Sequence, residues 1–182
     1  MTMLDRYIHY LHSHKVCYSH SIHAPAASAL EVADRDRVLA NEIAKSVAYI
    51  GDNGYGLAVV PADCEVDLRK LRILLGLIKI RVASEAELES ILPGAGKGPL
   101  PPFGSLFGVP VLLDSELAIQ DFIAFSAGSS RDVIRISVVD FLKLVNPSVG
   151  SIGLKMGRDL AERAAWSAPG VVEVIDHITI ES

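Results

Sequence analysis

A short turn between two apolar runs constrains the fold of this chain more than any other feature. Residues 46–50 and 55–60 are mostly aliphatic and aromatic, and Gly51-Asp52-Asn53-Gly54 stands between them. Glycine and asparagine tolerate the positive φ angles that a tight turn between two strands requires. The segment therefore predicts an antiparallel β-hairpin.

Further helices and strands surround this hairpin in an irregular order. Apolar spacing and capping residues predict helices over residues 4–12, 30–33, 68–75, 85–92 and 138–145. Alternating or continuous apolar runs predict strands over residues 16–22, 78–82, 109–113, 122–127 and 133–136. Because the strands outnumber the helices and do not alternate regularly with them, we predict an α+β fold rather than a repeating β-α-β fold.

The last part of the chain is separated from the rest by a turn-forming segment. Asn146-Pro147-Ser148-Val149-Gly150 indicates a boundary, which divides the chain into residues 1–148 and 149–182. Beyond it, residues 159–165 predict a helix and residues 171–180 a strand. About 30 residues cannot bury a core alone. We therefore expect this helix–strand tail to dock on the main domain or on a partner.

The composition is that of a folded protein. Of its 182 residues, 50% are hydrophobic and 21% are charged, a balance typical of one globular domain. No apolar run reaches the roughly 20 residues that cross a bilayer. The first residues lack the basic and then apolar order of a signal peptide. We expect a cytosolic protein without a membrane segment.

The charge distribution is uneven. A net charge of −5 argues against broad, non-specific binding of nucleic acid, which is typical of basic proteins. Residues 69–81, however, contain five lysines and arginines and no acidic residue. This stretch is either a solvated helix face or a local positive patch for RNA phosphates.

The cysteines and histidines do not form a recognisable metal motif. Cys17 and Cys64 are isolated, and neither belongs to a Cys-x-x-Cys pair. Five of the six histidines lie within residues 9–23, but no acidic or thiolate ligand has matching spacing. Solvated histidines are the favoured interpretation, and a histidine–metal hydrolase is the alternative.

Two further segments resemble catalytic motifs only in part. Residues 94–97 (GAGK) lack the first glycine and the final Ser or Thr of a phosphate-binding P-loop. Gly128-Ser129-Ser130 lacks the flanking glycines of a nucleophile elbow. The second segment therefore predicts a tight turn, whose backbone amides could line a pocket.

Lys45 and the segment 93–104 indicate a possible site only when they are taken together. A lysine that enters a strand is usually solvated. The segment PGAGKGPLPPFG contains four glycines and four prolines, which exclude regular structure. A rigid loop of this kind either connects elements or presents N–H groups to an oxyanion.

The order of these segments resembles a known family. It includes "IAKSVAYIGDNGYGLAVVPADCEVDLRKLRILLG", then "GPLPPFGSLFGVPVLLDSEL", then "AFSAGSSRDVIRIS". Over about residues 1–145 the chain resembles the YbaK and prolyl-tRNA synthetase-associated editing-domain family, and within it the stand-alone branch. The resemblance implies an α+β domain around a mixed, partly barrel-like β-sheet with packed helices. The tail is similar to the closing helix and strand of BON-type domains.

The resemblance also implies an activity and a site. Members of the family hydrolyse the ester of mischarged tRNA, so the expected partner is the acceptor end of such a tRNA. The family's central lysine matches Lys45, and its GxxxP loop matches residues 98–102. The implied catalytic residues are Lys45, Gly98 and Gly104. The implied substrate-binding residues are Pro101, Pro102, Phe103, Gly128 and Ser129.

The resemblance leaves several questions open. It implies no metal, no cofactor and no covalent nucleophile, with backbone N–H groups such as those of Leu100, Phe103 and Gly104 binding the oxyanion. The amino acid removed and the oligomeric state, monomer or homodimer, stay open. The competing hypothesis is an inactive module that binds aminoacyl-RNA ends or a protein partner.

Overall fold

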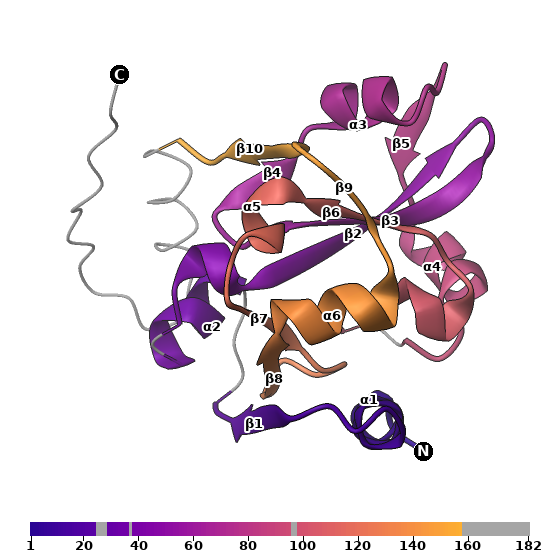
Figure 1. Ribbon diagram of the computed structural model, residues 1–182. Coiled ribbons are helices and arrows are strands. Elements are labelled where there is room, and N and C mark those ends of the chain that lie inside the picture. The colour runs from indigo at the N-terminus through magenta and orange to yellow at the C-terminus, as the bar shows by residue number, and fades with distance from the viewer. Residues whose placement is uncertain (25–28, 37, 96–97, 158–182) are drawn as a thin grey trace.

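Two sheets share one core in this structure (Figure 1), a computed structural model that describes residues 1–24, 29–36, 38–95 and 98–157. An antiparallel sheet has the order β1-β8-β7, with the bounds Tyr18–Ile22, Asp132–Ser137 and Phe122–Ser126. A mixed sheet has the order β5-β2-β3-β6-β9, with the bounds Ile80–Val82, Ala44–Gly51, Gly54–Pro61, Val111–Asp114 and Ser148–Gly150. A parallel bridge between Ile43 and Ala124 joins the two sheets.

The helices cover this curved pair of sheets. Their bounds are α1 Met3–Ser13, α2 Ala29–Asp36, α3 Leu68–Leu74, α4 Glu85–Ile91, α5 Ser115–Ala118 and α6 Val138–Val145, with 3₁₀ turns η1 at Ala40–Glu42 and η2 at Gly104–Phe107. The predicted α+β class is confirmed. The two sheets curve around a common core. None of the described helices combines the length and the apolarity needed to cross a lipid bilayer.

The predicted hairpin is confirmed and is longer than expected. β2 and β3 pair over eight residues each, from Ala44 opposite Pro61 to Gly51 opposite Gly54. The turn itself is Asp52-Asn53, and Gly54 follows it with a φ of +136°. That angle is one that residues with a Cβ rarely adopt, so glycine is needed there.

Local capping chemistry sets several helix ends. The Asp67 carboxylate accepts from the backbone N–H groups of Arg69 and Lys70 at the start of α3. Ser84 and Glu87 form the predicted capping box of α4. Ser137 accepts from the N–H of Asp140 at the start of α6. Each contact satisfies N–H groups that lack a partner within the first turn of the helix.

Alternation along the strands divides the buried residues between two faces. The main core lies inside the curved sheets and includes Ala44 and Ala48 of β2 with Phe103. A second cluster lies on the other face of the mixed sheet, where Tyr49 packs with Leu71 of α3. Successive side chains of a strand point to opposite faces, which explains the division.

Three short strands were missed by the sequence analysis. β4 (Cys64–Val66) pairs with β10 (Gly153–Lys155), and β9 lies parallel to β6. β9 crosses the predicted boundary between residues 148 and 149. The predicted tail helix and strand lie outside the described residues, so the two-part division stays a prediction.

Candidate active site

The central strand β2 has an opening along one edge. Directly before its start, Ile43 is bridged to Ala124 of β7, and near its end Tyr49 pairs with Val82 of β5. Within the described parts of the chain, no strand pairs with this edge between residues 45 and 47. The two neighbouring strands therefore diverge beside Lys45 and Ser46, where backbone polar groups are left without a strand partner.

Lys45 stands at this opening in a partly buried environment. It lies opposite Val60 in the hairpin, on the face of the sheet that carries Tyr49. Burial lowers the pKa of Lys45, and the negative charge of Glu65 is the largest opposing influence. Asp63 opposes the shift more weakly. Burial therefore outweighs the local carboxylates, which makes this ammonium group easier to deprotonate than that of an ordinary lysine.

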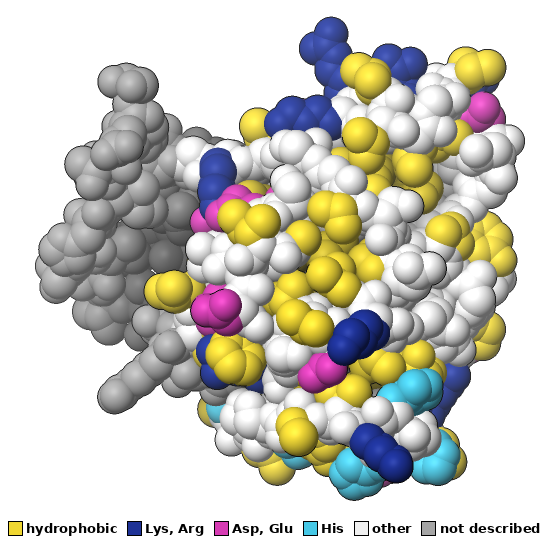
Figure 2. Space-filling view, in the orientation of Figure 1, with side chains coloured by type: hydrophobic (Ala, Val, Ile, Leu, Met, Phe, Trp, Pro, Cys, Tyr) yellow, Lys and Arg dark blue, Asp and Glu magenta, His cyan; other side chains and the backbone are white. Residues whose placement is uncertain are grey.

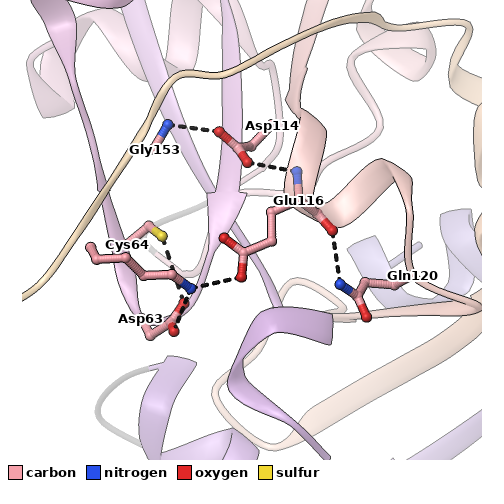
Figure 3. Close-up of polar contacts among 7 residues, drawn as sticks. Asp63, Cys64, Asp114, Glu116, Gln120 and Gly153 are labelled. Atoms are coloured by element: carbon pink, nitrogen blue, oxygen red, sulfur yellow. Dashed lines mark hydrogen bonds and ion pairs between the residues drawn. The ribbon is translucent and has the colours of Figure 1, made fainter. Parts of the chain in front are cut away.

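An ion-pair network (Figure 3) includes Asp63, one of the carboxylates whose charge acts on Lys45. Lys155 donates to Asp63 at 2.8 Å and to Glu116 at 2.7 Å. Burial opposes protonation of Lys155, but these two hydrogen bonds raise its pKa above the ordinary value. Burial raises the pKa of the neighbouring Cys64 thiol to about 12. Cys64 is therefore a protonated thiol at neutral pH and is unsuited to act as a nucleophile.

Two of the predicted site segments meet through their glycines. A Cβ added to Gly98 would lie 3.0 Å from the carbonyl oxygen of Gly128. Gly128 has a φ of +83°, and a Cβ there would collide with the side chain of Met3 on α1. The loop and the turn are therefore in backbone contact, and glycine is required at the turn for both conformational and steric reasons.

The end of the predicted loop, residues 101–104, is anchored in the hydrophobic core. The ring of Phe103 is fully buried and contacts the rings of Tyr7, Phe125 and Phe141 at centroid distances of 5.5, 5.0 and 5.4 Å. Gly104 is packed so tightly that a Cβ would collide with the carbonyl oxygen of Val109. Pro101 and Pro102 are also buried. The Phe103 side chain thus supports the loop from the core and does not line an open surface.

The strand register separates Lys45 from the ring of Phe103. Ala44 and Ala48 belong to the same core as Phe103, whereas Lys45 points to the other face of β2. β7 runs parallel to β2 from the bridge at Ala124, so the chain proceeds from that bridge toward Gly128 alongside the opening. The structure therefore brings Gly98, Gly128 and Ser129 together and places Lys45 on the opposite face of the sheet from the buried end of the loop.

Ser129 organises a polar turn that the sequence analysis did not foresee in full. Its hydroxyl donates to Asp132 at 2.6 Å and accepts from the N–H groups of Arg131 and Asp132. His20 bonds the other oxygen of Asp132 at 2.8 Å. Partial burial opposes ionisation, yet the bonds from Ser129 and His20 hold the pKa of Asp132 below its usual value.

This arrangement differs from a catalytic triad because Asp132, not the histidine, stands in the middle. Asp132 and His20 were missed as possible site residues. The Ser129–Asp132 spacing of three residues was the available clue, since the same spacing marks the caps at Ser84 and Ser137. His20 was expected to be solvated, but its side chain is only 23% exposed.

Two buried hydroxyls have no hydrogen-bond partner within the described residues. They are Ser46 Oγ, on the face of β2 that carries Ala44 and Ala48 and opposite to the face of Lys45, and Tyr7 Oη, whose ring packs against Phe103. Burial raises the pKa of Tyr7. An unpaired buried hydroxyl is costly, so Ser46 is a further candidate for contact with a bound molecule. In the sequence it was hidden within an apolar run.

The histidines of residues 9–23 are dispersed among different partners. His12 bonds the Tyr18 hydroxyl and His14 bonds the carbonyl oxygen of Tyr10. The part of the chain that the structure describes contains no cluster of three His, Cys, Asp or Glu side chains suited to a metal ion.

The molecule is therefore an α+β domain with a half-buried lysine at a gap in its central sheet and a glycine–proline loop braced against a polar turn. Residues 23–144 match the aminoacyl-tRNA editing domain family, and the chain belongs to that family. The predicted resemblance to the YbaK and prolyl-tRNA synthetase-associated editing domains is confirmed.

Known relatives agree with this assignment. The chain is 31% identical over 100 residues to the multifunctional Ser/Thr-tRNA deacylase ProXp-y of Escherichia coli strain K12, and equally to that of strain O157:H7. The match covers 54% of this chain and 59% of either relative, so it spans about three fifths of the length of these curated proteins.

Solved structures support the fold. A proposed trans-editing enzyme for prolyl-tRNA synthetase superposes with a TM-score of 0.71 at 22% identity, over 86% of this chain and 99% of its own. A scaffold protein used for epitope grafting superposes with a TM-score of 0.73 at 23% identity, over the same shares of the two chains. At these identities the similarity establishes the architecture.

Proposed function

We propose that this protein is an aminoacyl-tRNA deacylase that hydrolyses the ester of mischarged tRNA in trans. The observation that carries the proposal is the position of Lys45, half-buried at the opening of β2 in a chain of the editing-domain family. The name of the Escherichia coli relative, a Ser/Thr-tRNA deacylase, supports the same activity. The reaction would take place where tRNA is charged, in agreement with the cytosolic location expected from the sequence.

The chemistry requires positioning more than a strong nucleophile. An aminoacyl ester is already activated, so the protein has to orient a water molecule and stabilise the oxyanion that forms. Lys45 would hold the carbonyl oxygen or the terminal ribose by charge-assisted hydrogen bonds. Its lowered pKa would also let a neutral fraction accept a proton from water.

Backbone N–H groups are the natural oxyanion donors. The unpaired edge of β2 beside Ser46 supplies one candidate group, and the part-exposed loop residues Gly98 and Leu100 supply others. Ser129 is occupied by Asp132 and by two backbone N–H groups. Its role in this proposal is to shape the turn beside Gly98, so that the loop presents a fixed backbone to the substrate.

The decisive experiment is a deacylation assay across a panel of mischarged tRNAs, with seryl- and threonyl-tRNA tested first. Lys45→Ala should lower the rate on the sensitive substrate by about two orders of magnitude, the usual effect of losing one such stabilising group. Lys143→Ala, an exposed lysine on α6, is the matched control and should keep the wild-type rate.

Two results would contradict the proposal. Unchanged hydrolysis by a folded Lys45→Ala protein would remove Lys45 from the site. Absence of hydrolysis by the wild type on every tRNA of the panel would favour the alternative, an inactive module that binds aminoacyl-RNA ends or a protein partner.

A further inference from the structure

A cationic surface lies at the far end of β2 from Lys45. It is formed by α3 and by the segment that connects α3 to β5, and we call it the α3–β5 face. Its members are Arg69, Lys70, Arg72, Ile73, Ile78 and Lys79. Figure 2 shows lysine and arginine side chains gathered at the top of the molecule, where Figure 1 places α3.

The cations of this face are available to a ligand. Within the described residues, Arg69, Arg72 and Lys79 form no ion pair, whereas Arg81 is held by Glu87 in a bidentate contact at 2.8 and 2.7 Å. The nearest carboxylates are engaged by backbone. Asp52 accepts from the N–H groups of Ile78 and Lys79, and Asp67 caps α3.

The face is also hollowed and partly apolar. A shallow depression of about 600 Å³ is lined by three isoleucines, three cations, one glycine and one carboxylate: Ile50, Ile78, Ile80, Arg72, Lys79, Arg81, Gly51 and Asp52. Ile73 and Ile78 are 68% and 76% exposed. Aliphatic surface between cations suits a sugar–phosphate backbone, which presents apolar ribose edges between anionic groups.

The charge of the α3–β5 face indicates which kind of molecule binds there. The whole chain carries a net charge of −5, so this local concentration of cations would attract a polyanion to this face of an otherwise acidic protein. We propose that the α3–β5 face binds the phosphate backbone of the tRNA whose aminoacyl end occupies the site at Lys45. This inference rests on the proposed function.

The spacing of the two sites fits this arrangement. Lys45 and Gly51 lie six residues apart on β2, and six strand residues span about 20 Å. A tRNA whose 3′ end lies at Lys45 can therefore reach α3 with the phosphates of the nucleotides that precede this end.

The test combines binding and catalysis. Arg72→Glu/Lys79→Glu should weaken binding of uncharged tRNA about tenfold or more near 0.1 M salt and reduce the slope of log Kd against log salt by about two. Hydrolysis of full-length mischarged tRNA should show a raised KM with unchanged kcat. Hydrolysis of an aminoacylated terminal adenosine alone should be unaffected, because that substrate does not reach the face.

The control has the same change of net charge at another place. Lys15→Glu/Lys143→Glu alters two exposed lysines beside α1 and on α6, and its tRNA affinity should stay near that of the wild type. Equal loss of affinity in both double variants would overturn the proposal, as would an unchanged salt slope in Arg72→Glu/Lys79→Glu.

Two outcomes separate this inference from its alternatives. If the wild type hydrolyses no mischarged tRNA, the proposed function fails. The α3–β5 face would still be supported as an RNA surface if Arg72→Glu/Lys79→Glu lost binding of uncharged tRNA and the control variant kept it. If that variant loses binding to anionic lipid vesicles and keeps its tRNA affinity, the face is a membrane surface and the proposal is wrong.

Discussion

Gly98 and Gly128 touch through their backbones, although 30 residues separate them in the chain. A Cβ on Gly98 would approach the carbonyl oxygen of Gly128 to 3.0 Å, closer than such atoms normally come. The glycine–proline loop and the polar turn at Ser129 are therefore fixed relative to each other by direct contact. Any side chain at position 98 has to push one of them away.

Gly98→Ala should consequently impair activity more than stability. A displacement of a few tenths of an ångström at a substrate-positioning loop should lower kcat/KM about tenfold, while the free energy of unfolding falls by about 1 kcal/mol or less. Deacylation kinetics and urea unfolding measure the two effects. Gly157→Ala, where no atom of the described residues lies within 4 Å of the added Cβ, is the control and should change neither quantity.

Lys45→Met should stabilise the protein while it removes activity. Burial disfavours the charged form of Lys45 and lowers its pKa from the ordinary 10.5. A methionine of similar length avoids that cost, so the free energy of unfolding at pH 7 should rise by about 1 kcal/mol or less. The same substitution at the exposed Lys143 should give no such gain.

The gain at Lys45 should also depend on pH in a defined direction. Between the lowered pKa of the folded state and 10.5, the unfolded chain binds a proton that the folded chain lacks. The contribution of Lys45 to the free energy of unfolding of the wild type therefore rises with pH across that window. The difference in unfolding free energy between Lys45→Met and wild type should shrink as pH rises, and a difference that grows would contradict burial as the cause.

Asp114 should be a major stabilising residue. It is 4% exposed, and its carboxylate accepts from the backbone N–H groups of Glu116, Ile152 and Gly153 at 2.8, 2.8 and 2.7 Å. Asp114→Ala should cost about 3 kcal/mol, because buried N–H groups lose their partner. Urea unfolding measures the loss. Asp121→Ala, at an exposed aspartate, should change stability by less than about 0.5 kcal/mol.

Ser129→Ala should distinguish a turn-forming serine from a nucleophile. The hydroxyl accepts from two backbone N–H groups and donates to Asp132, so its loss should cost about 1–2 kcal/mol. Activity should fall several-fold through loosening of the turn. A loss near 10⁶-fold, the scale for a catalytic serine, would show that Ser129 reacts with the substrate. Ser130→Ala serves as the neighbouring control.

Local elements of the fold could be predicted from the sequence because their causes lie within a few residues. The Asp52-Asn53 turn, the capping box of Ser84 and Glu87, and α6 with its cap at Ser137 all depend on neighbours three or four positions away. The resemblance to the editing family was also present in the order of the segments. The short strands β4, β9 and β10 could not be predicted in this way, because three residues carry too little periodicity to distinguish a strand from a loop.

The site depends on contacts that no local pattern contains. Whether Lys45 is solvated or half-buried was decided by the packing around β2, and the pKa of its ammonium group by that burial against the charges of Glu65 and Asp63. Phe103 was expected beside the substrate, and the tertiary structure places its ring in the core.

By itself, the sequence determined the α+β class, the central hairpin, most helix ends and the family. Only the tertiary structure decided that β2 is left open beside Lys45, that Gly98 meets Gly128, and that Asp114 holds residues 152–153. The physical reason is distance along the chain. Capping and turn formation act between near neighbours, whereas burial, pKa shifts and an unpaired strand edge arise only when segments 30 to 80 residues apart pack together.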